Sequence, residues 1–194
     1  MKNLILPCFV TVCLLTACNG NKTKNPARDE AKPSTEIIAD SAGDIQQRLE
    51  QMKKLAPLSP DQIKALFPEE LADLKQSDYR RINNEEYEAG EATYKSDDGK
   101  EVHLTIFDCV GEAGVGKYNI MYLGYIDMES EDESGYKKSV SFNGGKAIES
   151  YEKKEDKYGI LFPSGDRLLI NVEGEKTGLD AVKQAAGSLN LKIN

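Results

Sequence analysis

Apolar residues upstream of the middle of the chain recur at helical spacing. Between Asp44 and Leu55 they share one helical face with charged residues between them, and Pro57 follows. This period predicts an amphipathic helix over 44–55. Its apolar face either packs on its own domain or is offered to a partner.

The next segment carries signals for further helices. Ser59-Pro60-Asp61-Gln62 combines an N-cap serine, a proline at the first helical position and a glutamine three residues after the cap, which is the pattern of a capping box. A short helix is therefore expected to run to Phe67. Pro68-Glu69-Glu70 predicts another through about Gln76, which completes an N-terminal helical segment over about 44–76.

From Asn84 onward the apolar period becomes that of strands. Aromatic and branched residues alternate with polar ones between clusters of turn-forming residues such as Asn143-Gly144-Gly145. This alternation between turn signals predicts antiparallel strands joined by hairpins. The expected strands cover 86–95, 101–110, 136–142, 147–153, 158–162 and 167–172.

Two later segments have helical spacing. Apolar residues between Leu179 and Leu189 share one helical face, which predicts a last helix that closes over the sheet. Those between Lys117 and Met128 fit a helix or a strand, and helix is favoured; their tyrosines either pack in the core or stack on a ligand. The element order predicts an α+β fold with a mostly antiparallel sheet of about six strands and helices on one face.

The N-terminus has a different pattern. Lys2 is followed by an apolar run from Leu4 to Leu15, which Pro7 interrupts, and then by small residues that end at Cys18. This is the layout of a secretory signal peptide. Because the run is shorter than the ~20 residues of a membrane-spanning helix, no permanent transmembrane segment is expected.

The four residues Leu15-Thr16-Ala17-Cys18 resemble the lipobox of bacterial lipoproteins. The resemblance implies that 1–17 is a cleaved signal peptide and that Cys18 is lipidated, which would anchor the chain to a membrane of the bacterial cell envelope. Polar residues over 18–36 would form a flexible tether, and 37–194 a single α+β domain. No acidic cluster directly follows Cys18, which favours the periplasmic face of the outer membrane over surface display.

Net charge and cysteine content exclude some classes of partner and of metal site. The formal net charge is −8 over 194 residues, and an acidic surface repels phosphates, so no nucleic-acid partner is expected. Cys8 and Cys13 would leave with the signal peptide and Cys18 would carry lipid, which leaves Cys109 alone. One cysteine forms neither an intrachain disulfide nor a cysteine-rich metal site.

One glycine-rich stretch has the spacing of a phosphate-binding loop. Gly111 to Lys117 matches that spacing, but Tyr118 stands where a serine or threonine would hold magnesium. The stretch is therefore interpreted as a flexible loop between a strand and a helix, and no cofactor is expected.

The single histidine and the remaining cysteine suggest a nucleophile and its base. His103 and Cys109 lie on one predicted strand at a separation of ~20 Å, whereas a nucleophile and its base must lie within ~3 Å. Cys109 is therefore expected to be a small buried residue and His103 a partly exposed one. No other catalytic set can be nominated, so an enzyme is not predicted.

An acidic run is the remaining candidate site. Its order differs from that of a calcium-binding EF-hand loop, which needs glycine at its sixth position. A solvated acidic loop is the simplest interpretation, with a loose cation site or a docking patch for a basic partner as alternatives. The run comprises Asp127, Glu129, Glu131, Asp132 and Glu133.

These features together predict a lipid-anchored envelope protein that binds a molecule and catalyses no reaction. A protein-interaction module with a partner in the envelope is favoured. The alternatives are a periplasmic carrier of a small ligand or cation, and an inhibitor- or immunity-type lipoprotein that turns its acidic run towards a basic toxin.

Overall fold

The structure, a computed structural model, describes residues 42–82, 86–191 and 193. The chain divides into two units, Met1–Ser34 and Thr35–Asn194, and the described residues belong to the second. The predicted signal peptide, Cys18 and the tether lie outside the described residues. None of the helices described has both the length and the apolar character needed to cross a membrane.

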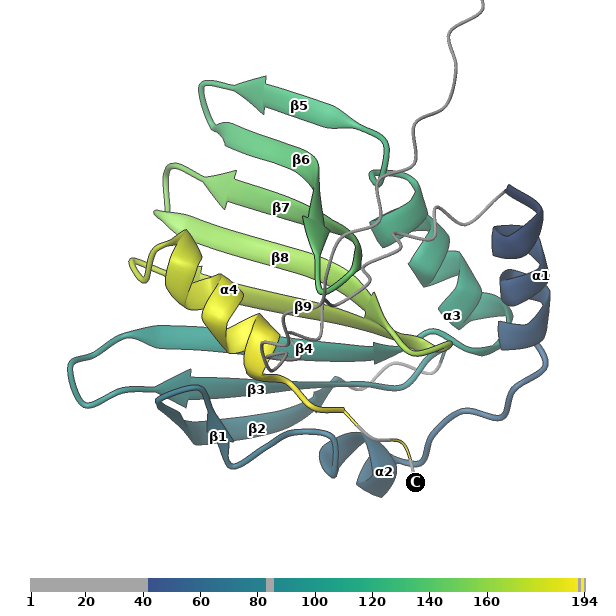
Figure 1. Cartoon of the computed structure of the whole chain (residues 1–194). Helices are drawn as coiled ribbons and strands as arrows, with labels where there is room; N and C mark the ends of the chain where they lie inside the picture. Colours follow the sequence, from purple (N-terminus) through teal and green to yellow (C-terminus); the bar gives the residue numbers. More distant parts are fainter. Residues whose placement is uncertain (1–41, 83–85, 192, 194) are drawn as a thin grey trace, which may run out of the picture. The chain divides into compact units, whose positions relative to one another are not determined.

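In the described part of the chain, nine antiparallel strands form one sheet in the order β1-β2-β3-β4-β9-β8-β7-β6-β5 (Figure 1). Strands β1 to β4 make one meander and β5 to β9 another, and β4 joins the two by pairing with β9. The strands are β1 (Glu70–Leu71), β2 (Leu74–Ile82), β3 (Ala89–Lys95), β4 (Glu101–Asp108), β5 (Glu129–Asp132), β6 (Gly135–Phe142), β7 (Gly145–Glu152), β8 (Lys157–Ser164) and β9 (Leu168–Glu175).

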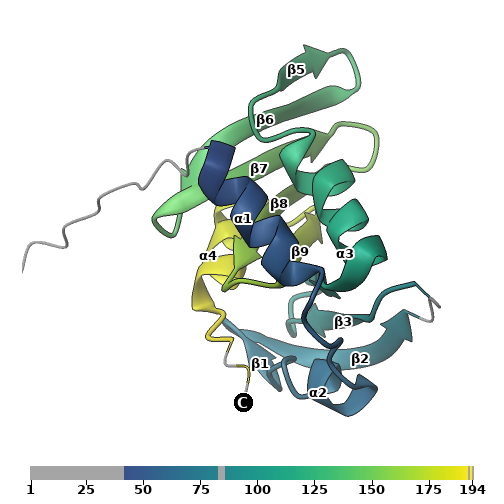
Figure 2. The same ribbon diagram turned by 90° about the vertical axis from the view of Figure 1, so that its right-hand side faces the viewer.

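Helices cover both faces of the sheet (Figures 1 and 2). On one side, called the α3 face, lie α1 (Ala42–Met52), α3 (Gly111–Tyr118) and the π-helical turn η1 (Asn119–Leu123). On the other side, called the α4 face, lie α2 (Pro60–Lys64) and α4 (Leu179–Ser188).

Each set of helices covers its own hydrophobic core. Strand side chains alternate between the two faces, so Ile106 packs in the core of the α4 face and its neighbour Phe107 in that of the α3 face. Ile160 and Leu161 of β8 divide in the same way. The prediction of helices on one face is therefore wrong, because the central strands are apolar on both sides and both sides have to be covered.

The α+β class and the antiparallel sheet are confirmed, but the sheet is larger than the six strands predicted. The predicted strands are present as β3, β4, β6, β7, β8 and β9. Of the additional strands, β1 is two residues long, and β2 and β5 consist mainly of charged and polar residues. Neither kind of strand has the apolar alternation by which strands are predicted.

The helix predicted over 68–76 is wrong. The chain turns at Ala72, whose φ is 53°, and β1 pairs with the start of β2. Further along β2, Arg80 faces Glu91 of β3 with 2.9 Å between Nη2 and Oε2. An exposed charged pair therefore lies where an apolar stripe would be expected, and backbone pairing with β3 holds this strand in the sheet.

The other predicted helices are present, although α2 ends at Lys64 and not at Phe67. Helices α1 and α4 occupy predicted segments. The capping box is formed, since Oγ of Ser59 accepts from the backbone N–H of Gln62 at 3.2 Å and Oε1 of Gln62 accepts from that of Ser59 at 2.9 Å. Helix α3 and η1 confirm the helical interpretation for 117–123, whereas 124–127 form turns. Helix α3 already begins at Gly111, so Gly111–Lys117 is helix and not a loop.

Candidate functional site

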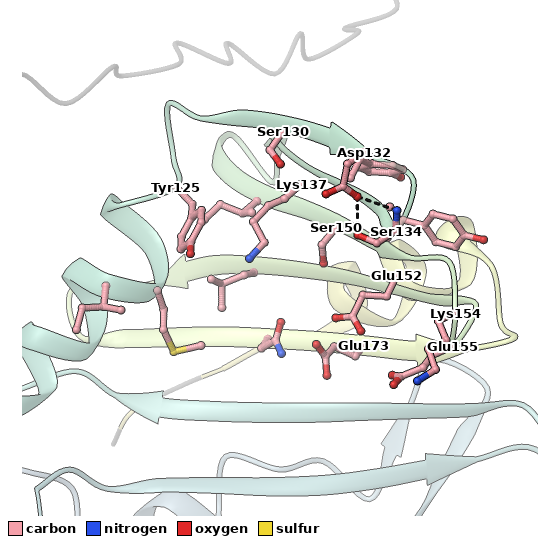
Figure 3. A pocket seen from close by; sticks show the side chains of 18 residues that line it. Tyr125, Ser130, Asp132, Ser134, Lys137, Ser150, Glu152, Lys154, Glu155 and Glu173 are labelled. Atoms are coloured by element: carbon pink, nitrogen blue, oxygen red, sulfur yellow. Dashed lines mark hydrogen bonds between the residues drawn. The ribbon is translucent and has the colours of Figure 1, made fainter.

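The helices leave part of the α3 face uncovered (Figure 3). Beyond η1, strands β7, β8 and β9 present polar side chains on this face, and the β5–β6 hairpin borders them (Figure 3). The uncovered part is an open groove of about 630 Å³. It combines apolar and charged residues, and we take it as the candidate site.

Two cross-strand rows form the floor of the groove. In the first row Ser150 lies opposite Gly159, and Gly159 opposite Glu173. The second row lies two residues along each strand and consists of Ile148, Leu161 and Asn171. The hydrogen-bonded register of β7, β8 and β9 thus brings together residues that are far apart in the sequence.

Gly159 lies buried between the side chains of Ser150 and Glu173. A Cβ atom at this position would lie 2.7 Å from Oγ of Ser150 and 3.5 Å from Cγ of Glu173. A larger residue would therefore fill the space between the two polar side chains. A strand glycine at such a place allows the close approach of a neighbouring side chain, here that of Ser150.

One end of the groove is apolar. Ile120 and Met121 of η1 and the following Tyr125 line this end, next to the apolar residues of the floor. Ile120 is 72% exposed and Tyr125 is 38% exposed. Nζ of Lys137 lies 4.2 Å from the centre of the Tyr125 ring (Figure 3). This lysine of the groove therefore already makes a cation–π contact.

The other end of the groove is acidic, with Glu152, Glu155 and Glu173 among its lining residues (Figure 3). Nζ of Lys157 lies 3.2 Å from a carboxylate oxygen of both Glu152 and Glu155. Burial disfavours the charged form of Lys157, but its attraction to Glu155, Glu173 and Glu152 outweighs burial and raises its pKa above the ordinary value. Lys154 also lines this end (Figure 3). Two lysines therefore accompany three glutamates, and negative charge is in excess at this end.

Three polar side chains of the floor have hydrogen-bonding capacity to spare. Ser150, Asn171 and Glu173 are half-buried. Within the described ranges, none of these side chains takes part in a hydrogen bond or an ion pair. They can therefore offer a hydroxyl, an amide and a carboxylate to a bound molecule.

The acidic run predicted as a loop is strand β5 with its adjoining turns, and all five acidic residues are exposed. Successive residues of a strand point to opposite faces. Asp132 lines the groove, so Glu129 and Glu131 point to the other side of β5. The structure therefore brings one residue of the run, Asp132, to the groove.

Asp132 is held by its own hairpin. Its Oδ1 accepts a hydrogen bond from the backbone N–H of Ser134 at 2.7 Å. Hydrogen bonds from the Ser134 side chain and backbone keep the pKa of Asp132 below its ordinary value. Among the described residues, no three side chains of His, Cys, Asp or Glu come together as a metal site.

The structure does not bring His103 and Cys109 into contact. Nδ1 of His103 lies 3.2 Å from Oγ1 of Thr93, and Nε2 lies 3.3 Å from Glu101. Cys109 is fully buried, as predicted, and burial raises its pKa to about 12. A thiol with such a pKa is not ionised near neutral pH and is a poor nucleophile.

The stretch with phosphate-loop spacing serves packing. A Cβ atom on Gly114 would lie 2.6 Å from the carbonyl carbon of Cys109, so the glycine allows α3 to approach β4 closely. Nζ of Lys117 lies 5.3 Å from the ring centres of both Tyr87 and Phe107. The lysine that would bind a phosphate is therefore placed over aromatic rings.

Two buried carboxylates lie outside the groove, and both have several partners. Glu149 of β7 is 2% exposed and accepts from Nζ of Lys183 at 2.7 Å, from the hydroxyl of Tyr136 at 2.9 Å and from Nζ of Lys138 at 3.2 Å. These contacts join helix α4 to strands β6 and β7. Burial disfavours the charged form of Glu149, but the hydrogen bonds outweigh burial and lower its pKa.

Asp108 is the second buried carboxylate. Its oxygens accept from Nε and Nη2 of Arg167 at 2.8 and 2.6 Å, and from the backbone N–H of Leu58 at 2.8 Å. Nη2 of Arg167 also donates to the carbonyl of Ala56 at 2.8 Å. This pair fastens the segment between α1 and α2 to the sheet.

The residues of the groove floor are not among those that the sequence singles out. Asn171 interrupts the apolar run from Leu168 to Val172, and a polar residue there is a local sign of an uncovered face. Ser150 and Glu173 have no comparable sign, because polar residues alternate with apolar ones in many strands.

No family model, no curated protein and no solved structure matches the chain. Any function has to be argued from the groove and from the N-terminal motif.

Proposed function

We propose that the chain is a lipoprotein anchored to the bacterial cell envelope, on the periplasmic face of the outer membrane, and that its folded domain is a protein-interaction module. The groove on the α3 face carries the second half of this proposal. Exposed apolar residues at one end and unpartnered polar groups in the floor offer both contact area and specific hydrogen bonds to a partner.

The anchor is argued from the resemblance of Leu15-Thr16-Ala17-Cys18 to a lipobox. One acyl chain holds a protein on a membrane only marginally, whereas two hold it stably. Lipids on Cys18 would therefore keep the domain at the membrane. Radiolabelled palmitate fed to the cells is expected to label the wild-type chain and not Cys18→Ala.

Binding is favoured over catalysis by the arrangement of polar groups. Ser150 is the hydroxyl in the groove floor, and His103 lies three strands away, with Gly159 and Glu173 between them in register. Three interstrand steps of ~4.8 Å make ~14 Å, whereas a serine and its base must lie within ~3 Å. The groove thus lacks the contact that would activate this serine.

Photo-crosslinking in the native cells tests the interaction. A photoreactive amino acid is placed at Ser150 in the groove and, as a matched control, at Gln47 on the exposed side of α1. One partner protein is expected to crosslink from Ser150 and not from Gln47, with a lower yield when Cys18→Ala removes the anchor. Equal crosslinking from both positions would contradict the proposal.

A further inference from the structure

We propose that the groove binds an extended peptide segment of the partner in which an apolar residue and a lysine or arginine are two positions apart. The apolar side chain would lie at the η1 end and the basic one beside Glu173. This inference rests on the proposed function, because it assigns a peptide chemistry to the same groove.

The η1 end has the character of a site for one apolar side chain. Ile148 and Leu161 form its base and are 3% and 8% exposed. Met121 and Tyr125 stand at its edge, with the strongly exposed Ile120 beside them. A bound leucine- or phenylalanine-like side chain would remove apolar surface of all these residues from water.

The acidic end has fewer cationic side chains than carboxylates. Glu173 makes no ion pair within the described part of the chain, and Lys157, which interacts with it electrostatically, already pairs with Glu152 and Glu155. Lysine or arginine is the side chain that complements a half-buried carboxylate with charge-assisted hydrogen bonds. An anionic ligand would lie beside the unpaired carboxylate of Glu173 and be repelled.

The spacing of the two ends matches an extended chain. The rows of Leu161 and Gly159 are two residues apart along β8, which is about 6.6 Å at the rise of a strand. Side chains two positions apart in an extended peptide point to the same side at the same interval. Ser150 and Asn171 lie in these rows and can bond the peptide backbone.

The probe is a pentapeptide with blocked ends that carries leucine and lysine two residues apart, made in both orders, and the control has glutamate in place of lysine. Binding is measured by NMR titration of the full chain carrying Cys18→Ala, which maps the perturbed residues as well as the affinity. The lysine peptide in one order is expected to bind at least about tenfold more tightly than the glutamate peptide. The perturbed signals should lie in β7, β8 and β9.

Variants assign the preference to one carboxylate. Glu173→Gln is expected to reduce the preference for lysine by about tenfold, because it removes one charge-assisted contact. Glu175→Gln makes the same change of charge two residues further along β9, outside the groove lining, and should leave the preference unchanged. Gly159→Ala should weaken both peptides, and its melting temperature checks that it is folded.

Several results would overturn the inference. These are equal affinity for the lysine and glutamate peptides, an unchanged preference in Glu173→Gln, or groove signals that respond to chain concentration, which would assign the groove to a second copy. If a partner still crosslinks from Ser150 in that case, the proposed interaction function is retained and the proposed preference for an apolar–basic peptide is refuted. If no partner crosslinks, the proposed function fails by its own test.

Discussion

Glu149→Gln is the substitution whose effect the structure defines most sharply. The wild-type carboxylate is buried and accepts hydrogen bonds from Lys183, Tyr136 and Lys138. Glutamine has nearly the same shape but no charge, and its amide group replaces one acceptor with a donor. Two lysines that face a carboxylate in the wild type would face an amide in the variant.

The expected cost is about 2 kcal/mol of unfolding free energy. Removing one partner of a fully buried ion pair costs about 3–5 kcal/mol. The side chains of Lys138 and Lys183 are 40% and 37% exposed, so both ammonium groups can regain water, and the value for hydrogen bonds to charged groups, about 1.5–3 kcal/mol, is the better guide. For a domain of this size the melting temperature should fall by roughly 4–8 °C.

The pH dependence gives the decisive signature. The folded-state pKa of Glu149 lies below the ordinary value of 4.5. The stability that its charge contributes is therefore fully present above that value and is lost as the pH falls through the folded-state pKa. Since the glutamine variant has no such charge to lose, the stability gap between wild type and variant should narrow below about pH 4.5.

Urea unfolding of the full chain carrying Cys18→Ala, at neutral pH and at about pH 3, measures this gap. Glu129→Gln changes an exposed carboxylate on β5 and should shift the free energy by less than about 0.5 kcal/mol. A gap of equal size at both pH values would refute the role of the Glu149 charge. So would a Glu149→Gln variant as stable as the wild type at neutral pH.

Three further substitutions and one labelling experiment probe the packing around α3 and β4. Gly114→Ala should destabilise the chain by about 1–3 kcal/mol, because its Cβ would meet the backbone of Cys109 at 2.6 Å. Gly116→Ala, with no atom within 4 Å of its Cβ, should stabilise it by about 0.5–1 kcal/mol; urea unfolding that gave both the same sign would contradict this. Asp108→Asn should cost about 3 kcal/mol in the same assay, since it breaks the buried pair with Arg167, and an unchanged midpoint would show that the pair contributes nothing. With a pKa raised to about 12, Cys109 should resist iodoacetamide in the folded chain and react in guanidinium chloride, as followed by mass spectrometry of its peptide.

Local features of the fold could be predicted from the sequence because their causes lie within a few residues. The capping box of Ser59 forms as expected, since both of its hydrogen bonds join residues three positions apart. Asn143 and Gly144 both have positive φ, at 48° and 78°, which is the geometry that an Asn-Gly pair favours in a tight hairpin. The same local reasoning located six strands and the last helix.

The predictions that failed depend on residues distant in the sequence. Residues 68–76 carry helix signals, but β3 offers pairing partners that only the folded chain brings near, and β2 forms instead. The covering of both faces follows from the position of β4, β8 and β9 at the centre of the sheet. The residues of a strand do not by themselves determine where that strand lies in the sheet.

Most residues of the groove likewise could not be predicted from local sequence features. The acidic run and the single histidine and cysteine stand out in the sequence by composition, yet the structure brings one of those residues, Asp132, to the groove. The floor is made by Ser150, Gly159 and Glu173, which are ordinary residues of three strands. The sequence by itself determined the N-terminal motif, the turns and the period of most elements, because these depend on neighbouring residues. Only the tertiary structure decided which polar side chains share one uncovered face, because strand register and helix placement set that together.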